Sequence, residues 1–184
     1  MKIKFNQNNI KRAIVSAFAV GSVGISAASY ANTEMRVSTT VGASCIVSID
    51  STMVFANYDP VSLHAENDLI KQQQIKAQCT SGASTIIGID AGLNTAGSLA
   101  GADVANPARR MKATVEGVDS YINYNLYVDD TDVAAIWGGI STGQEHTGTG
   151  SEVNILVEGR VTAGQTAVAG VEYYDTVTVS YDLG

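Results

Sequence analysis

The sequence predicts an all-β fold, a sandwich of two sheets, from the periodicity of its apolar residues. Roughly seven or eight short segments alternate apolar and polar side chains, and turn residues separate them. After residue 31, no stretch of ten or more residues repeats apolar side chains at the helical period. The chain has 184 residues, of which 45% are hydrophobic and 16% charged, so one packed domain is expected and global disorder is not.

The clearest predicted strand covers residues 173–182. Val177, Val179 and Tyr181 fall on one face of an extended chain, and Thr or Ser occupies the positions between them. Neither Pro nor Gly interrupts this alternation, and β-branched residues favour a strand. The edges of this strand therefore need partners, either earlier in the chain or outside it.

A second alternating stretch, residues 35–49, is too long for one strand of a small sandwich. Its 15 residues would span roughly 50 Å at about 3.3 Å each, whereas strands usually have about five or six residues. Gly42 is a natural break, so residues 43–49 are expected to form the first strand of the domain. The residues before it form an amphipathic extension whose apolar face holds Met35, Val37, Thr39 and Val41.

The remaining predicted strands are separated by turn residues. A hairpin is expected for residues 71–90, because the segments 71–80 and 85–90 alternate on either side of a Ser-Gly-Ala-Ser turn. A long surface loop is expected from residue 91 to residue 107, which is rich in Gly, Ala, Asn and Ser. Further strands are expected at residues 53–55, 111–118, 121–128 and 153–157, the last with Val153, Ile155 and Val157 on one face.

Residues 1–31 have the three-part layout of a secretory signal, with cleavage expected after Ala31. A membrane-spanning helix needs about 20 apolar residues, and the apolar run here is shorter and contains Gly and Ser. Removing this segment takes away four of eleven basic residues and none of eighteen acidic ones, so the net charge changes from −7 to −11. That charge argues against nucleic acid or an anionic membrane as a partner.

The only two cysteines, Cys45 and Cys79, lie in segments that alternate like strands. In an exported chain an even number of cysteines predicts a disulfide, here with a structural role. No metal site is expected, because His64 and His146 lack the spacing of zinc ligands. No cofactor is expected either.

No catalytic constellation is found, so the chain is not expected to be an enzyme or to take a small-molecule substrate. Asp129, Asp130 and Asp132 do not fit a calcium loop, which needs Gly at its sixth position and Glu at its twelfth, and are expected to form a solvated turn. Neither histidine accompanies a Gly-x-Ser-x-Gly nucleophile motif.

Arg109 and Arg110 are expected to be solvated residues on a loop beside a strand, although they could meet an acidic partner surface. Tyr121, Tyr124, Tyr127 and Trp137 could form a platform for a sugar. Packing is the preferred interpretation for Tyr124, because it shares a face with Ile122 and Leu126.

Several motifs, in order along the mature chain, resemble the spore coat U domain, a family similar to the pilins of archaic chaperone-usher pili. The resemblance is strongest in the last twenty-five or so residues. The motifs are Cys45 in an Ala-Ser-Cys strand, Phe55-Ala56-Asn57-Tyr58, Arg109-Arg110-Met111, Gly164-Gln165, and Tyr173-x-Asp175-Thr176-Val177-Thr178-Val179.

The resemblance implies an immunoglobulin-like sandwich that lacks its final strand. Beside the C-terminal strand a groove would stay open until a periplasmic chaperone, and then the N-terminal extension of the next subunit, fills it. In this chain residues 32–41 would be the extension, with Met35, Val37, Thr39 and Val41 as the donor strand, and residues 42–184 the pilin domain. The groove would be lined by Val177, Val179 and Tyr181, with Val153, Ile155 and Val157 as neighbours.

Two functions remain open at this point. The first is a structural subunit of a fimbrium. Such a subunit would polymerise head to tail with copies of itself or related pilins, and an outer-membrane usher would pass it to the cell surface. The fibre would serve attachment and biofilm formation. The second is a self-contained secreted coat or carbohydrate-binding domain, in which residues 35–41 fold back as its own edge strand. Gly42 permits both.

Overall fold

The computed structural model describes residues 32–97, 100–128 and 135–184. The expected signal segment, residues 1–31, and the acidic residues Asp129, Asp130 and Asp132 lie outside the described residues. Residues 40–184 form one compact unit, and residues 32–39 belong to another.

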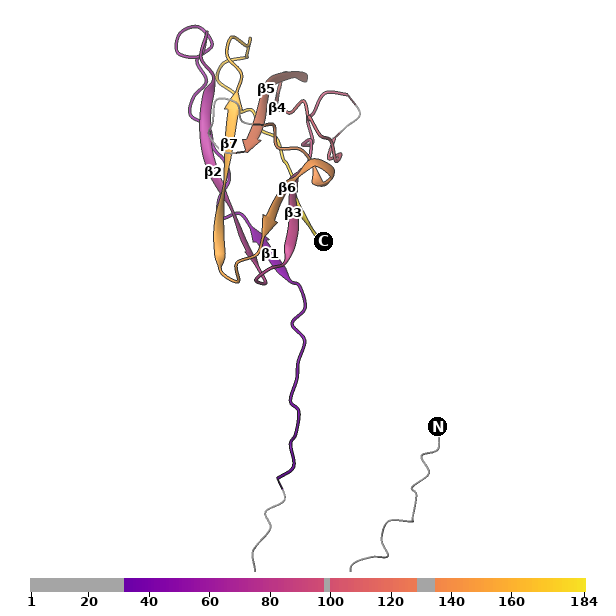
Figure 1. The fold of residues 1–184 in the computed structure, drawn as a ribbon. Coiled ribbons are helices and arrows are strands. Elements are labelled where there is room, and N and C mark those ends of the chain that lie inside the picture. The colour runs from indigo at the N-terminus through magenta and orange to yellow at the C-terminus, as the bar shows by residue number, and fades with distance from the viewer. Residues whose placement is uncertain (1–31, 98–99, 129–134) are drawn as a thin grey trace, which may run out of the picture. The chain divides into compact units, whose positions relative to one another are not determined.

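Within the described residues, eight strands form two antiparallel sheets, which confirms the predicted all-β sandwich (Figure 1). The five-stranded sheet has the order β1-β2-β7-β5-β4, and the three-stranded sheet has the order β6-β3-β8. The larger sheet contains β1 (Cys45–Ser48), β2 (Leu69–Cys79), β7 (Glu152–Val161), β5 (Val118–Val128) and β4 (Arg110–Val115). The smaller contains β6 (Gln144–Thr147), β3 (Ser84–Ile89) and β8 (Val179–Leu183), and a short 3-10 helix, Ile140–Thr142, precedes β6.

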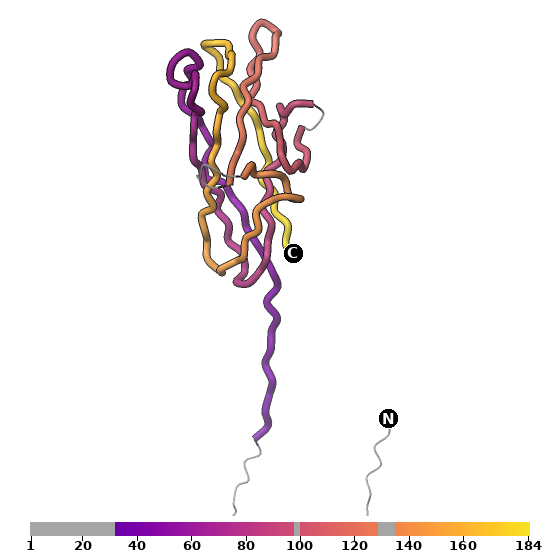
Figure 2. The backbone as a smooth tube through the Cα atoms, turned by 45° about the horizontal axis from the view of Figure 1, so that its top comes forward, coloured from indigo at the N-terminus to yellow at the C-terminus, as the bar shows by residue number. Residues whose placement is uncertain are grey.

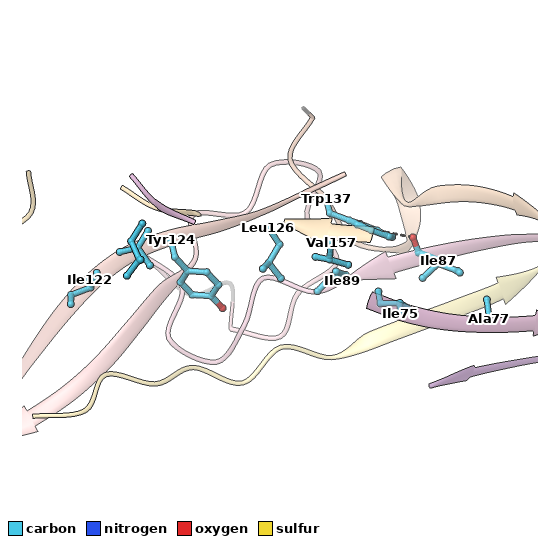
Figure 3. Close-up of a cluster of buried hydrophobic side chains, with 11 residues drawn as sticks. Ile75, Ala77, Ile87, Ile89, Ile122, Tyr124, Leu126, Trp137 and Val157 are labelled. Carbon is cyan, nitrogen blue, oxygen red and sulfur yellow. Dashed lines mark hydrogen bonds between the residues drawn. The ribbon is translucent and has the colours of Figure 1, made fainter. Parts of the chain in front are cut away.

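Both sheets contribute to one hydrophobic core (Figure 3). One of its members is Trp137, which is 0% exposed and donates a hydrogen bond from Nε1 to the carbonyl oxygen of Ile87 at 2.9 Å. Tyr124 is also buried in this core, so packing is confirmed for it. The alternate residues of the strands that face the other sheet make up the rest of the core: Leu69, Ile75, Ala77, Ile87, Ile89, Ile122, Leu126, Val157 and Val161.

The predicted hairpin of residues 71–90 is wrong, although both of its strands exist. β2 pairs with β1 and β7 in the larger sheet, whereas β3 pairs with β6 and β8 in the smaller one. The turn between them therefore carries the chain from one sheet to the other. Alternation did not reveal this, because a strand buries one face against the core whichever sheet contains it.

Two other segments differ from the predicted strands. Residues 53–55 form no strand, and instead Met53 and Phe55 pack against the core from an irregular segment. They lie over Gly159 of β7, where a Cβ would overlap the Met53 sulfur and the Phe55 ring. The C-terminal strand begins only at Val179, because residues 174–178 bond to β4 and to the segment after β3.

Candidate functional site

The last strand, β8, has one unpaired edge. β8 pairs with β3 on one side, and no strand of the described residues pairs with it on the other. Just beyond each end of the strand, the amide of Asp90 donates to the carbonyl of Thr178 (3.0 Å) and that of Gly184 to Ser84 (3.2 Å). In the even-numbered residues of β8 the backbone N–H and C=O groups therefore point toward β3. Those of Val179, Tyr181 and Leu183 point toward the unpaired edge.

One edge strand of the larger sheet, β1, likewise has one unpaired edge. Among the residues that the structure describes, β1 pairs only with β2, and the amide of Thr80 donates to the carbonyl of Ser44 at 2.9 Å. The backbone groups of Cys45 and Val47 consequently point away from β2. The predicted disulfide is confirmed: Cys45 and Cys79 are opposite each other in the β1–β2 register, and their bond fastens this short edge strand to the sheet.

The two unpaired edges lie close together. The hydroxyl of Tyr181 in β8 donates a hydrogen bond to the carbonyl oxygen of Cys45 in β1 at 3.0 Å. Figure 2 shows the yellow C-terminal segment ending near the violet segment that contains β1. We call the region between β8 and β1 the open side. It offers two rows of backbone groups to an added strand.

The predicted groove residues take up different positions around the core. Val177 and Val179 are half-buried against it, whereas Tyr181 is 43% exposed. Val153, Ile155 and Val157 lie in β7, between β2 and β5 in the middle of the larger sheet, and pack against the same core. They are therefore not hydrogen-bonded neighbours of β8. Val47 of β1, also half-buried, joins this apolar set.

Residues 32–44 form no helix or strand and run as an extended segment (Figure 1). Three large apolar side chains of this segment are almost fully exposed: Met35 at 84%, Val37 at 83% and Val41 at 76%. Thr39 is exposed too. Apolar side chains that recur at alternate positions and are this exposed mark a surface for interaction.

The prediction that Arg109 is solvated is wrong, because its side chain is 1% exposed. Its guanidinium donates to the carbonyls of Asp90 (2.7 Å), Ile89 (2.7 Å) and Trp137 (2.8 Å), and to Oδ1 of Asn125 (3.2 Å). Burial lowers the pKa of Arg109 to about 10, which still leaves it charged at neutral pH. The residue is structural and is not available to an acidic partner.

Arg110 is half-buried rather than solvated. Its guanidinium lies over the ring of Tyr121, 4.1 Å from the centroid, and donates to the carbonyls of Asn94 (3.0 Å) and Thr95 (3.1 Å). Sequence reasoning named Asp175 within a motif but missed its role: its carboxylate accepts from the amide of Asn94 (3.0 Å) and the hydroxyl of Tyr124 (2.8 Å). Burial, and then Asp175, raises the pKa of Tyr124 far above its ordinary value.

His64 has structural surroundings. Nδ1 of His64 accepts from the amide of Asp59 at 2.9 Å, and its ring stacks on Tyr58 at 5.3 Å between centroids. The described part of the chain holds no group of three or more His, Cys, Asp or Glu residues that could bind a metal ion. It also holds no helix of the length and apolar character needed to cross a membrane.

The comparison with protein families identifies the chain. The family model of the Spore Coat Protein U domain matches residues 31–180. This chain belongs to the Spore Coat Protein U domain family. Among its relatives is "Protein U" of Myxococcus xanthus, which is 32% identical over 182 residues, a length that covers 94% of this chain and 98% of that protein.

A similar fold occurs in a solved structure, the CsuC–CsuE chaperone–tip adhesion subunit pre-assembly complex from archaic chaperone-usher Csu pili of Acinetobacter baumannii. The match has a TM-score of 0.51 and 16% sequence identity, and covers 78% of this chain. This chain spans only 40% of the solved one. The similarity establishes a shared fold.

Proposed function

We propose that this Spore Coat Protein U domain chain is a structural subunit of an archaic chaperone-usher pilus that polymerises by donor-strand complementation. The observation that carries the proposal is the pair of unpaired edges at the open side, β8 and β1. The same chain carries an extension with exposed apolar side chains at alternate positions. A strand that needs a partner and a segment that needs an apolar surface thus occur in one molecule.

In this proposal the donor segment, residues 35–41, enters the open side of the next subunit as an added strand. Its backbone would bond to the free N–H and C=O groups of β8, and Met35, Val37, Thr39 and Val41 would face the core. Because the donor and the open side are different surfaces, the contact runs head to tail and does not close, so copies assemble into a fibre.

The proposal includes the cellular route. Residues 1–31 direct export, the mature chain begins at Asn32, a periplasmic chaperone covers the open side before assembly, and an outer-membrane usher passes the subunit to the surface. The solved structure of similar fold supports this route, because it is a complex of a chaperone with a pilus subunit. Surface attachment and biofilm formation are the roles we propose for the fibre.

The test places a charge on one or the other face of the donor segment. Val37→Arg would bury an unpaired cation in the neighbour's core at a cost of several kcal/mol per contact, so it should abolish fibres. The adjacent Ser38→Arg is the matched control, because its side chain would point outward and the fibre should survive. Electron microscopy gives the fibre yield, and co-purification gives the amount of chaperone complex.

The Val37→Arg subunit should still fold and bind the chaperone, because the extension belongs to no core before assembly. Val179→Asp should instead prevent the subunit from accumulating, since Val179 packs against the subunit's own core. Normal fibres from Val37→Arg would refute the proposal. A soluble monomer of the natural chain without any chaperone would favour the self-contained coat or carbohydrate-binding domain.

A further inference from the structure

We propose that the donor segment enters antiparallel to β8 in the one register that sets Arg36 of one copy opposite Asp182 of the next. This inference rests on the proposed function and specifies how its contact is aligned. Donor-strand addition alone leaves the register free, because backbone hydrogen bonds are the same at every two-residue shift.

The charges of the two strands select this register. Asp182 is the one charged residue of β8, and Arg36 is the one basic residue of the described extension, residues 32–44. Both side chains are exposed, and neither has an ion-pair partner within the part of the chain that the structure describes. Opposite charges directly across two strands attract, and like charges repel.

This register also matches the apolar faces. With Arg36 opposite Asp182, every donor residue expected to face the core meets a residue on the face of the C-terminal segment that holds the half-buried Val177 and Val179, and Ser38 meets Ser180 on the outer face. The core-facing pairs are Met35 with Leu183, Val37 with Tyr181, Thr39 with Val179 and Val41 with Val177. Charge and apolar pattern therefore favour the same alignment.

The neighbouring alignments are worse. A one-residue shift turns the apolar face of the donor outward. A two-residue shift in one direction sets Glu34 opposite Asp182, which is repulsive, and in the other direction it sets Ser38 there and removes the ion pair. A parallel strand with Arg36 opposite Asp182 would carry Val41 past the end of β8 and leave Thr33 against Val179.

Engineered disulfides test the register. The backbone N–H and C=O groups that point toward the open side belong to the odd-numbered residues of β8. Ser38 and Ser180 would therefore form a non-hydrogen-bonded pair, with Cα atoms about 4.5 Å apart. That separation suits a disulfide. The double variant Ser38→Cys with Ser180→Cys should therefore give covalent multimers that survive heating in SDS without reductant. Adding reductant should convert them to monomers.

The matched controls test the alignments shifted by two residues in either direction. Ser38→Cys combined with Thr178→Cys, or Thr40→Cys combined with Ser180→Cys, should give at least tenfold fewer covalent multimers than the Ser38–Ser180 pair. Multimers from either control at the expense of the Ser38–Ser180 pair would refute the register and reveal the true one. All of these positions are exposed in the structure, so the subunit fold should be retained.

A charge exchange tests the ion pair. Arg36→Asp and Asp182→Arg should each slow fibre assembly roughly two- to fivefold, the range expected for one cross-strand pair, and the double variant should restore the rate. Unchanged single variants, or no restoration, would refute the pairing. The proposed function is tested separately by Val37→Arg. Fibres from that variant would refute the proposed function itself, whereas the charge variants test only the register.

Discussion

Replacing the buried Arg109 should strongly lower the free energy of unfolding. Arg109→Met keeps much of the side-chain length and removes every hydrogen-bond donor. In the structure those donors join the end of β3, through Ile89 and Asp90, to the segment at Trp137 and to Asn125 of β5. The variant would therefore remove these links between the end of β3, the segment at Trp137 and β5.

The size of the effect follows from these contacts. A hydrogen bond from a charged donor contributes about 1.5–3 kcal/mol, and an acceptor left buried without a partner costs about 1–3 kcal/mol. Part of this loss is offset, because the variant no longer buries a charge, the same burial that lowers the pKa of Arg109 to about 10. We expect a net loss of about 3–5 kcal/mol in the free energy of unfolding, a large part of the roughly 5–15 kcal/mol of a typical domain.

The measurement is urea unfolding, followed by circular dichroism, of the subunit with its disulfide intact and its open side filled by an added peptide of residues 32–41. Arg110→Met is the matched control, because Arg110 is half-buried and bonds to two carbonyls, those of Asn94 and Thr95. We expect that variant to lose about 1–2 kcal/mol. If Arg109→Met costs no more than Arg110→Met, the structural role of Arg109 is refuted.

Two smaller effects are also expected. Tyr181→Phe removes the hydrogen bond between β8 and β1 and should lower the free energy of unfolding by about 1 kcal/mol; a cost above about 2 kcal/mol would show that Tyr181 does more than this bond. The hydroxyl of Thr114 and then the ammonium of Lys112 lower the pKa of Asp119, so its contribution to stability is present above about pH 4 and is lost as the pH falls through the lowered pKa. Thr114→Val should raise the pKa of Asp119 in an NMR titration, and an unchanged pKa would contradict this cause.

The sequence predicted the features that depend on local alternation. Period-two patterns located all or part of every strand except β6, because a strand between core and solvent must alternate. The cysteine count and the expected export signal predicted the disulfide, and ordered motifs predicted the family. The same alternation singled out the exposed extension, since the alternating stretch 35–49 has 15 residues and is too long for one strand of a small sandwich.

Other features depend on which segments meet in space, and only the tertiary structure decided them. β2 and β3 alternate as a hairpin would, yet lie in different sheets, because burial of one face does not specify the hydrogen-bonding partner. The sequence predicted Arg109 as a surface residue, because its acceptors are not apparent from its neighbours in the sequence. The carbonyls that bind it belong to segments about 20 and 28 residues away. The open side is likewise a tertiary property: whether an edge is unpaired depends on every other strand, and the residues of β8 alone do not determine it.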